Sequence, residues 1–404
     1  MTSLLDKLLG EATRLTRTGR LHEATAAIQQ ALAGFGPPHG AAADATVVEE
    51  RPAPGPTLHR EALAPGIETG RAAPGWRMPA PDRSARGRTA EPAVDVPAAD
   101  APAQPDVQRR SATGSFETHV YAGRTGTRQY KLFVPAGRSG QTLGLILMLH
   151  GCTQTPDDFA AGTRMNEVAA ERGFLVLYPA QAPRSNHSKC WNWFQPGDQR
   201  RGGGEPDLLA SLTRHIVQTH PVDPARVYVA GLSAGGAMAD NLGREYPDVF
   251  AAVGVHSGLP QGAAHDIPSA FAAMRHGAGA GAASGPDLAI KAPGAPTIVF
   301  HGDADATVHP SNGARVIGAA LAGAAAAEVA TERRSAGDRP VTRSVHRRPQ
   351  PGGAEPSLAE HWIVHGAGHA WSGGDPAGSY ADARGPDASR EMVRFFEEHP
   401  RRRT

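Results

Sequence analysis

The sequence predicts an α/β protein whose central sheet is mostly parallel and covered by helices on both faces. Short apolar, β-branched runs alternate with amphipathic helical runs from about residue 115 almost to the end of the 404-residue chain, an order typical of helices packed on a parallel sheet. The strand candidates are continuously apolar, as in LGLILML and FLVLYP, which indicates burial on both faces. The opening strands are joined by short turns and suggest an antiparallel start to the sheet.

The expected elements follow this alternation along the chain. Residues 323–357, rich in alanine and then in arginine and proline, predict an elaborated loop or an exposed hairpin. One helix is expected to begin directly after Ser233. Further helices are expected at 159–172, 206–219 and 387–399, and strands at 130–134, 143–149, 174–179, 227–231, 251–257, 297–302 and 361–366.

Two segments of different composition precede this domain, which we place at 115–400. Residues 1–34 carry apolar side chains at helical spacing on either side of a Gly-Arg break and predict a short helical hairpin. The part GRLHEATAAIQQAL resembles one helix of a tetratricopeptide unit, but one unit is too short for a solenoid. Residues 35–110, rich in Ala, Pro, Gly and Arg, bury too little apolar surface to offset their ordering entropy and predict a disordered linker.

The composition excludes several classes of protein. With 41 basic and 40 acidic side chains the net charge is +1, which argues against nucleic acid or an anionic membrane as the main partner. No apolar stretch approaches the roughly 18–20 residues of a membrane span. Charged residues interrupt the N-terminus every few positions, unlike a secretory signal, so we expect a cytoplasmic protein.

Only two cysteines are present, Cys152 and Cys190. They exclude a disulfide-rich scaffold and a Cys-only zinc site, but they permit one bridge. A bridge would require an oxidising compartment. Two unpaired thiols in a cytosolic protein are the open alternative.

The stretch VYVAGLSAGG places Ser233 in a G-x-S-x-G pattern between an expected strand and an expected helix. This context is the one that a nucleophile elbow requires. A serine raised above the sheet edge needs a strained backbone, and side chains two positions away would collide with their surroundings. Gly231 and Gly235 remove those side chains, and Gly236 adds room where the helix packs.

A serine hydroxyl needs a base and an orienting acid to become a nucleophile. TIVFHGDADATVHP offers Asp303 and Asp305 just after an expected strand. We favour Asp305 because it precedes Val308 by three residues, as in the pattern HG-x-x-D-x-x-V. Asp303 directly follows the tight HG turn, where a carboxylate commonly binds local backbone amides.

The base is expected in HWIVHGAGHAWSGG. His369 lies in the glycine-rich loop after the last strand, whereas His365 ends that strand. His150 and His301 each precede a glycine at a strand end, and we expect them to be structural. The order Ser233, acid, His369 is the order of the α/β-hydrolase fold.

The oxyanion of such a reaction needs two amide donors. One is expected from Ala234, directly after the nucleophile. The other is expected from Cys152 in HGCTQT, because that loop ends an early central strand beside the elbow.

The motifs LHGCTQTPDDFAAGTRMNEVA, CWNWF, VYVAGLSAGGAMA, HGDADATVHP and GAGHAWSGG together resemble the poly(3-hydroxybutyrate) depolymerase family of esterases, relatives of feruloyl and acetylxylan esterases. The resemblance covers about residues 115–398. It implies Ser233 as nucleophile, Asp305 as orienting acid and His369 as general base. It also implies pairing of Cys152 with Cys190, and an ester cleft lined by Trp191, Trp193 and Trp371.

The sequence therefore predicts a serine esterase that needs no metal or organic cofactor and hydrolyses poly(3-hydroxybutyrate) or its oligomers. Two alternatives stay open: a feruloyl or acetylxylan esterase, and a non-catalytic binding protein on a hydrolase scaffold. The chain shows no signal peptide and no Thr-rich linker or C-terminal polymer-binding module, which favours soluble oligomers over crystalline polymer. The family resemblance makes an extracellular location the alternative to the cytoplasm. Residues 1–34 could dock to a polymer granule or to a protein partner.

Overall fold

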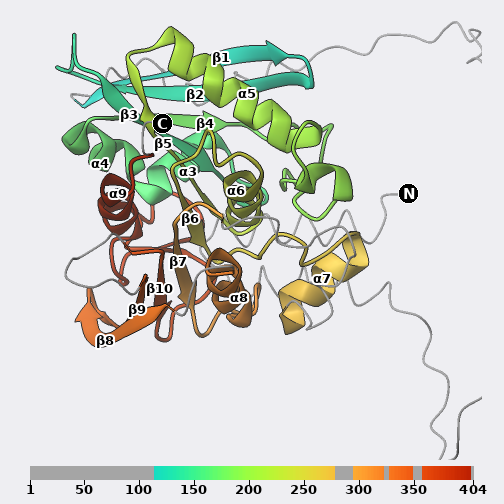
Figure 1. Ribbon diagram of the computed structural model, residues 1–404, viewed down its shortest axis with the longest axis vertical. Helices are drawn as coiled ribbons and strands as arrows, with labels where there is room; N and C mark the ends of the chain where they lie inside the picture. Colours follow the sequence, from blue (N-terminus) through green and yellow to red (C-terminus); the bar gives the residue numbers. More distant parts are fainter. Residues whose placement is uncertain (1–112, 278–293, 323–326, 349–356, 402–404) are drawn as a thin grey trace, which may run out of the picture.

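The computed structural model describes residues 113–277, 294–322, 327–348 and 357–401 (Figure 1). The hairpin predicted at 1–34 and the linker predicted at 35–110 lie outside the described residues, so both stay predictions. In the described part of the chain, no helix is long and apolar enough to cross a membrane.

Ten strands of the described residues form one sheet in the order β1-β2-β4-β3-β5-β6-β7-β10-β9-β8. The six central strands from β4 to β10 run parallel to one another. The strands are β1 (Gly114–Gly123), β2 (Gly126–Pro135), β3 (Leu143–Leu149), β4 (Phe174–Pro179), β5 (Val222–Leu232), β6 (Ala252–His256), β7 (Thr297–Gly302), β8 (Glu328–Ala336), β9 (Arg339–Arg347) and β10 (Ala359–Val364).

Both edges of the sheet are antiparallel. β1 pairs with β2 and β2 with β4 in antiparallel register, which confirms the antiparallel start expected from the short turns. At the other edge, β8 and β9 form an antiparallel hairpin that continues the sheet beyond β10, and β8 is almost entirely exposed. The exposed hairpin expected within 323–357 is therefore present in the described part of that segment.

Helices cover both faces of the sheet, as Figure 1 shows. Alternate residues of β3 enter two separate apolar cores: Leu145 and Leu147 pack with α5 and α6, while Ile146 and Met148 pack with α3, α4 and α9. The helices are α3 (Pro156–Thr163), α4 (Met165–Arg172), α5 (Gly204–Thr219), α6 (Ala234–Glu245), α7 (Ile267–His276), α8 (Ser311–Ala320) and α9 (Ala388–Glu398). This two-sided burial explains why the central strands are apolar at every position.

One expected helix differs from the structure. The single helix predicted at 159–172 is two helices, because Arg164 adopts a left-handed backbone with φ of 52° between α3 and α4. α3 begins one turn earlier than expected. Thr155 caps it by accepting a hydrogen bond from Asp158 N at 3.2 Å, and Pro156 occupies its first turn.

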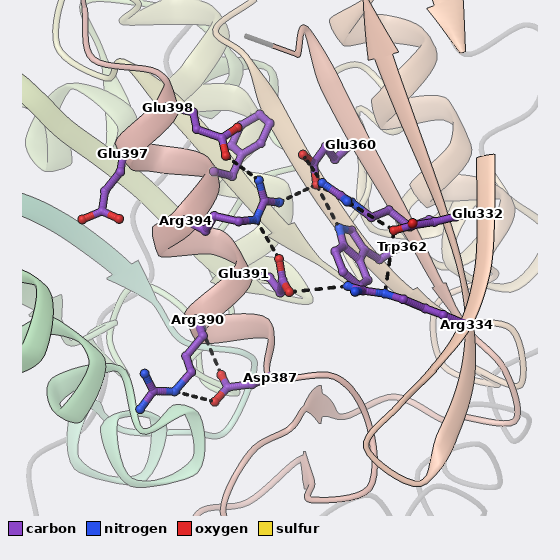
Figure 2. Close-up of polar contacts among 12 residues, drawn as sticks. Glu332, Arg334, Glu360, Trp362, Asp387, Arg390, Glu391, Arg394, Glu397 and Glu398 are labelled. Atoms are coloured by element: carbon purple, nitrogen blue, oxygen red, sulfur yellow. Dashed lines mark hydrogen bonds and ion pairs between the residues drawn. The ribbon is translucent and has the colours of Figure 1, made fainter. Parts of the chain in front are cut away.

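A buried ionic cluster fastens the β8–β9 hairpin to α9 (Figure 2). The carboxylate of Glu360 on β10, 1% exposed, accepts hydrogen bonds from Arg343 of β9 at 2.9 Å and from Arg394 of α9 at 2.7 Å. The guanidinium groups of Arg334 and Arg343 lie 5.0 and 5.2 Å from the centre of the Trp362 ring. The hairpin, the last central strand and the last helix are thereby held together.

Candidate active site

Ser233 lies at the sharp turn between β5 and α6, where the sequence predicted a nucleophile elbow. Its φ of 57° and ψ of −120° are strained for a residue with a side chain. The Ser233 N–H donates a hydrogen bond to the carbonyl of His256 at 2.9 Å, which ties the turn to the neighbouring strand β6. The serine is 9% exposed, so little of it is in contact with solvent.

The glycines around Ser233 are required by close backbone approach. A Cβ atom on Gly235 would clash with the carbonyl oxygens of Leu149 and His150, and one on Gly231 would clash with the backbone of Gly235. At Gly236 the space is less restricted, with the nearest atom 3.0 Å from a Cβ. The strand, turn and helix can approach each other only because these positions carry no side chain.

Asp305 and His369 form a buried pair after β7 and β10. His369 Nδ1 donates to Asp305 Oδ2 at 2.7 Å, and the two side chains are 10% and 0% exposed, the histidine being the more exposed. The other carboxylate oxygen of Asp305 accepts the backbone N–H groups of Thr307 and Val308, both at 2.9 Å. Burial alone would raise the pKa of Asp305, but the attraction of His369 and hydrogen bonds from His301 and His369 outweigh it and lower that pKa.

The competing acid and base also pair, but with each other. Asp303 Oδ2 lies 2.7 Å from Nδ1 of His365, and Asp303 Oδ1 accepts the Gly366 N–H at 2.6 Å. His365 Nε2 is 2.8 Å from the hydroxyl of Thr342 on β9. Asp303 thus anchors the start of the loop that carries His369 and does not contact His369 itself.

Strand order brings the three side chains to one edge of the sheet. Ser233 follows β5, Asp305 follows β7 and His369 follows β10, and these strands are parallel with only β6 between β5 and β7. Because its Nδ1 binds Asp305, His369 keeps Nε2 available as the proton acceptor. Among the described residues Ser233 Oγ makes no hydrogen bond to His369, a contact that often tightens only when substrate binds.

The backbone amides of Cys152 and Ala234 are two that have no acceptor among the described residues. On either side of Cys152 the amides are occupied: Gly151 N–H binds Gln154 Oε1 at 2.8 Å, and Thr153 N–H binds the Ser188 carbonyl at 2.7 Å. Gly151 lies against the nucleophile, since a Cβ on it would be 3.7 Å from the Cβ of Ser233. The two amides can therefore donate to an oxyanion formed at Ser233.

The buried His150 orients the peptide that ends in the Cys152 N–H. Its Nε2 accepts the Gln181 N–H at 3.1 Å, so Nδ1 carries the proton and donates to the Gly151 carbonyl at 2.7 Å. Burial lowers the pKa of His150 to about 4, which keeps the ring neutral near pH 7. In a trans peptide the C=O and N–H point in opposite directions, so this contact turns the Cys152 N–H away from His150.

The structure joins Cys152 and Cys190 in a disulfide. The bridge connects the loop after β3 to the loop that contains Trp191, and the Thr153–Ser188 backbone hydrogen bond connects the same two loops. Together they fix the position of the Cys152 amide.

The expectation that three tryptophans line an ester cleft disagrees with their positions. Trp191, Trp193 and Trp371 are 0%, 5% and 1% exposed. The Trp191 indole donates to the His150 carbonyl at 3.0 Å, and the Trp371 indole donates to Ser389 Oγ at 3.1 Å. The three rings belong to the two apolar cores, on which the loops pack, and their large apolar area is not at the surface.

Two residues beside the site were not singled out from the sequence. His256 ends β6, accepts the Ser372 N–H at Nε2 at 3.0 Å and stacks on Trp371. Burial lowers its pKa to about 3, with His301 and His369 acting in the same direction, so the ring is neutral. Tyr380, with φ of 52°, meets the His369 ring edge-on at 6.3 Å. Tyr380 lies just beyond the motif GAGHAWSGG, and no pattern in the sequence singled it out.

No group of three or more His, Cys, Asp or Glu side chains that could hold a metal ion occurs in the part of the chain that the structure describes.

Comparison with known proteins decides the family. The sequence profile of the family described as esterase PHB depolymerase matches residues 128–343, just over half of the chain. The chain belongs to this family. The matched range contains Ser233 and Asp305, whereas His369 lies beyond it.

Individual relatives of this chain carry related names. Poly(3-hydroxyalkanoate) depolymerase C of Paucimonas lemoignei is 37% identical over 193 residues, which are 46% of each chain. A probable acetylxylan esterase A of Aspergillus fumigatus is 27% identical over 51% of this chain and 58% of its own. Feruloyl esterase B of Thermothelomyces thermophilus is 35% identical over 31% of this chain and 43% of its own. The matches thus span about half the length of these relatives.

Among solved structures, an acetyl xylan esterase from Aspergillus awamori is similar in fold, with a TM-score of 0.53 and 19% identity over 70% of this chain and 100% of that chain. This likeness confirms the predicted α/β-hydrolase fold, and at that identity it concerns the fold alone.

Proposed function

We propose that this chain is a serine esterase that hydrolyses carboxylic esters through an acyl-enzyme, with Ser233 as nucleophile. The observation that carries the proposal is the buried Asp305–His369 hydrogen bond of 2.7 Å at the sheet edge where the strained Ser233 turn lies. A strained serine, an oriented histidine and an ionised acid at the ends of parallel strands in one sheet are the elements of a Ser-His-Asp triad.

The reaction begins when Ser233 Oγ attacks the ester carbonyl and His369 Nε2 takes the hydroxyl proton. Asp305, kept ionised by its lowered pKa, stabilises the imidazolium that forms. The oxyanion of the tetrahedral intermediate accepts hydrogen bonds from the Cys152 and Ala234 amides. His369 then gives its proton to the departing alkoxide, which leaves as the alcohol, and a water molecule activated by His369 hydrolyses the acyl-serine to release the acid.

We propose 3-hydroxybutyrate esters, as polymer or as oligomer, for the substrate. The family match and the 37% identity to a poly(3-hydroxyalkanoate) depolymerase support this choice. Esters of acetylated or feruloylated carbohydrate are the second candidate, favoured by the names of two further relatives. Docking of residues 1–34 to a granule or to a protein partner remains a prediction.

The test compares the purified protein with its Ser233→Ala variant on p-nitrophenyl butyrate, a soluble 3-hydroxybutyrate oligomer, amorphous polymer and methyl ferulate. We expect turnover only in the parent, with the hydroxybutyrate substrates preferred. A preference for ferulate would keep the mechanism and replace the substrate. Equal rates in both proteins, together with no labelling of Ser233 by a fluorophosphonate, would instead support a non-catalytic scaffold.

The Cys152–Cys190 disulfide supports an oxidising compartment and argues against the cytoplasmic location expected from the N-terminus. Alkylation of the protein taken directly from its source cells, with and without prior reduction, tests this. If both cysteines are alkylated without prior reduction, the thiols are free in the cell, and a reducing compartment is supported instead.

A further inference from the structure

Gln154 is a buried residue of the loop between β3 and α3, which also carries Cys152, and it uses every polar group of its side chain. The residue is 2% exposed. Its Oε1 accepts the Gly151 N–H at 2.8 Å, and its Nε2 donates to Asp158 Oδ2 at 2.9 Å and to the Ser379 carbonyl at 3.0 Å. One amide group therefore connects the loop after β3, the helix α3 and a segment 225 residues away.

The distant segment is itself held firmly on α3. Ser379 donates its N–H to Asp158 Oδ1 at 2.8 Å and its hydroxyl to Asp158 Oδ2 at 2.5 Å. Gly378 packs so closely on Gly162 and the Asp158 carbonyl that a Cβ there would clash with both. The backbone contact fixes the spacing between α3 and this segment.

The same segment leads directly to the general base. Tyr380 follows Ser379, its ring meets the ring of His369 edge-on, and its carbonyl accepts the Trp371 N–H at 2.6 Å. His369 stands two residues before Trp371 in the chain. The contacts from Gly151 through Gln154 and Ser379 to His369 thus join the loop of the oxyanion donor with the loop of the base.

Gln154 also determines which amide of its loop stays available. With the Gly151 N–H bound to Gln154 and the Thr153 N–H bound to Ser188, the Cys152 N–H is the amide of these three that has no acceptor among the described residues. Loss of the Gln154 acceptor would free the Gly151 amide and let the peptide on either side of Gly151 rotate, because glycine tolerates many backbone conformations.

We propose that Gln154 is a positioning residue for the oxyanion hole, which fixes the Cys152 amide relative to the loop of His369. Gln154 acts through the backbone and does not touch the substrate. This inference rests on the proposed esterase function.

The first experiment measures kcat and KM of Gln154→Ala on p-nitrophenyl butyrate, and its Ki for a trifluoromethyl ketone that forms a tetrahedral adduct with serine. Removing an oxyanion donor lowers kcat by about 10²–10³-fold, and misplacing one should lower it by about 10–100-fold, with KM changed less than about threefold. The Ki should rise in proportion to the loss in kcat/KM, because both depend on the tetrahedral state.

The second experiment uses Gln154→Glu and the ratio of its kcat to that of the parent between about pH 8 and about pH 5.5. When ionised, the introduced carboxylate would face the carboxylate of Asp158, and this repulsion raises the pKa of the pair. In its protonated form the new side chain has the shape of glutamine and donates an O–H in place of the N–H. We therefore expect the ratio to rise as the pH falls, and a merely space-filling role for residue 154 predicts a constant ratio.

Gln199 offers a matched control. It is 3% exposed, its Oε1 accepts the Gly262 N–H at 2.8 Å, and its Nε2 donates to the carbonyls of Phe194 and Ala264 at 2.8 and 2.9 Å. Gln199→Ala should lower the melting temperature about as much as Gln154→Ala does, with kcat within about threefold of the parent. Equal losses of kcat in the two variants, or an unchanged Ki in Gln154→Ala, would overturn the proposal.

The two hypotheses fail in distinguishable ways. If the parent hydrolyses no ester and no fluorophosphonate labels Ser233, the proposed function fails. If the parent is active, Ser233→Ala is inactive and Gln154→Ala retains the kcat and Ki of the parent, the esterase function stands and only the role of Gln154 is refuted.

Discussion

Asp305 and His369, 64 residues apart in the chain, form a buried hydrogen bond of 2.7 Å. Two residues before Asp305, Asp303 forms a bond of the same length with His365. The carboxylates differ in surroundings: the side chain of Asp305 is 0% exposed and that of Asp303 is 41% exposed. These two Asp–His pairs lie close together after β7 and β10, and the buried one fits the triad.

The two pairs provide a matched test of the catalytic acid. Asp305→Asn keeps the shape but removes the charge that stabilises the imidazolium and sets the tautomer of His369. We expect kcat to fall by about 10⁴-fold, the size of the loss that the equivalent change causes in serine proteases. Asp303→Asn should keep kcat within about tenfold. Steady-state kinetics with p-nitrophenyl butyrate measures both, and a larger loss in Asp303→Asn would reverse the assignment.

The crowded glycine at the Ser233 turn gives a prediction about stability. Gly235→Ala inserts a methyl group against the carbonyls of Leu149 and His150, and such overpacking typically costs about 1–3 kcal/mol. Denaturant unfolding should show this loss, together with reduced labelling of Ser233 by a fluorophosphonate. The control is Gly318→Ala in α8, where a Cβ meets no atom within 4 Å, and alanine should stabilise the helix by about 1 kcal/mol.

The local patterns of the sequence were sufficient for the central strands and for the residues around Ser233, whereas the edge strand β1 (Gly114–Gly123) was not predicted. Leu143–Leu149 and Thr297–Gly302 are strands with the expected bounds, and both are buried throughout. The elbow at Ser233 could be predicted because its requirements lie within five consecutive residues. Helix α7 was not predicted, although Asp266 and Ser269 form a capping box and Pro268 occupies its first turn, signals that are readable in a sequence.

Other features depend on contacts between distant parts of the chain. The burial of Trp191 and Trp371 follows from the packing of loops on the two cores, and an indole in a loop sequence gives no sign of which side it faces. The contact of Gln154 with Ser379 joins positions 225 residues apart. Neither the hydrophobic periodicity nor the residue spacing within either segment predicts such a contact.

Buried neutral histidines predict acid sensitivity. Burial lowers the pKa of His361 to about 4, with the nearby His301 and His346 acting in the same direction, whereas an unfolded histidine titrates near about 6.5. Between these values the unfolded chain binds a proton that the folded chain does not. The free energy of unfolding must therefore decrease as the pH falls through this window.

The variant His361→Gln tests this contribution. Removing one such proton should reduce the slope of unfolding free energy against pH by about 1.4 kcal/mol per pH unit in the window. Urea unfolding at several pH values between about 6.5 and about 4 measures the slope. A slope identical to that of the parent would show that His361 is not neutral in the folded protein.

The ionic cluster around Glu360 predicts a second pH dependence, of a carboxylate. Burial alone would raise the pKa of Glu360, but hydrogen bonds and charges from Arg343 and Arg394 outweigh it and lower that pKa. The stabilisation is then present above the pKa of the unfolded glutamate and is lost as the pH falls through the folded value. Glu360→Gln removes the charge while two guanidinium groups remain beside it, so we expect a loss of about 1–3 kcal/mol near pH 7. The control is Glu332→Gln, because Glu332 also contacts Arg343 but its side chain is 48% exposed. This variant should change the free energy of unfolding by less than about 0.5 kcal/mol. Equal losses in the two variants would show that the burial of Glu360 adds nothing to its ion pairs.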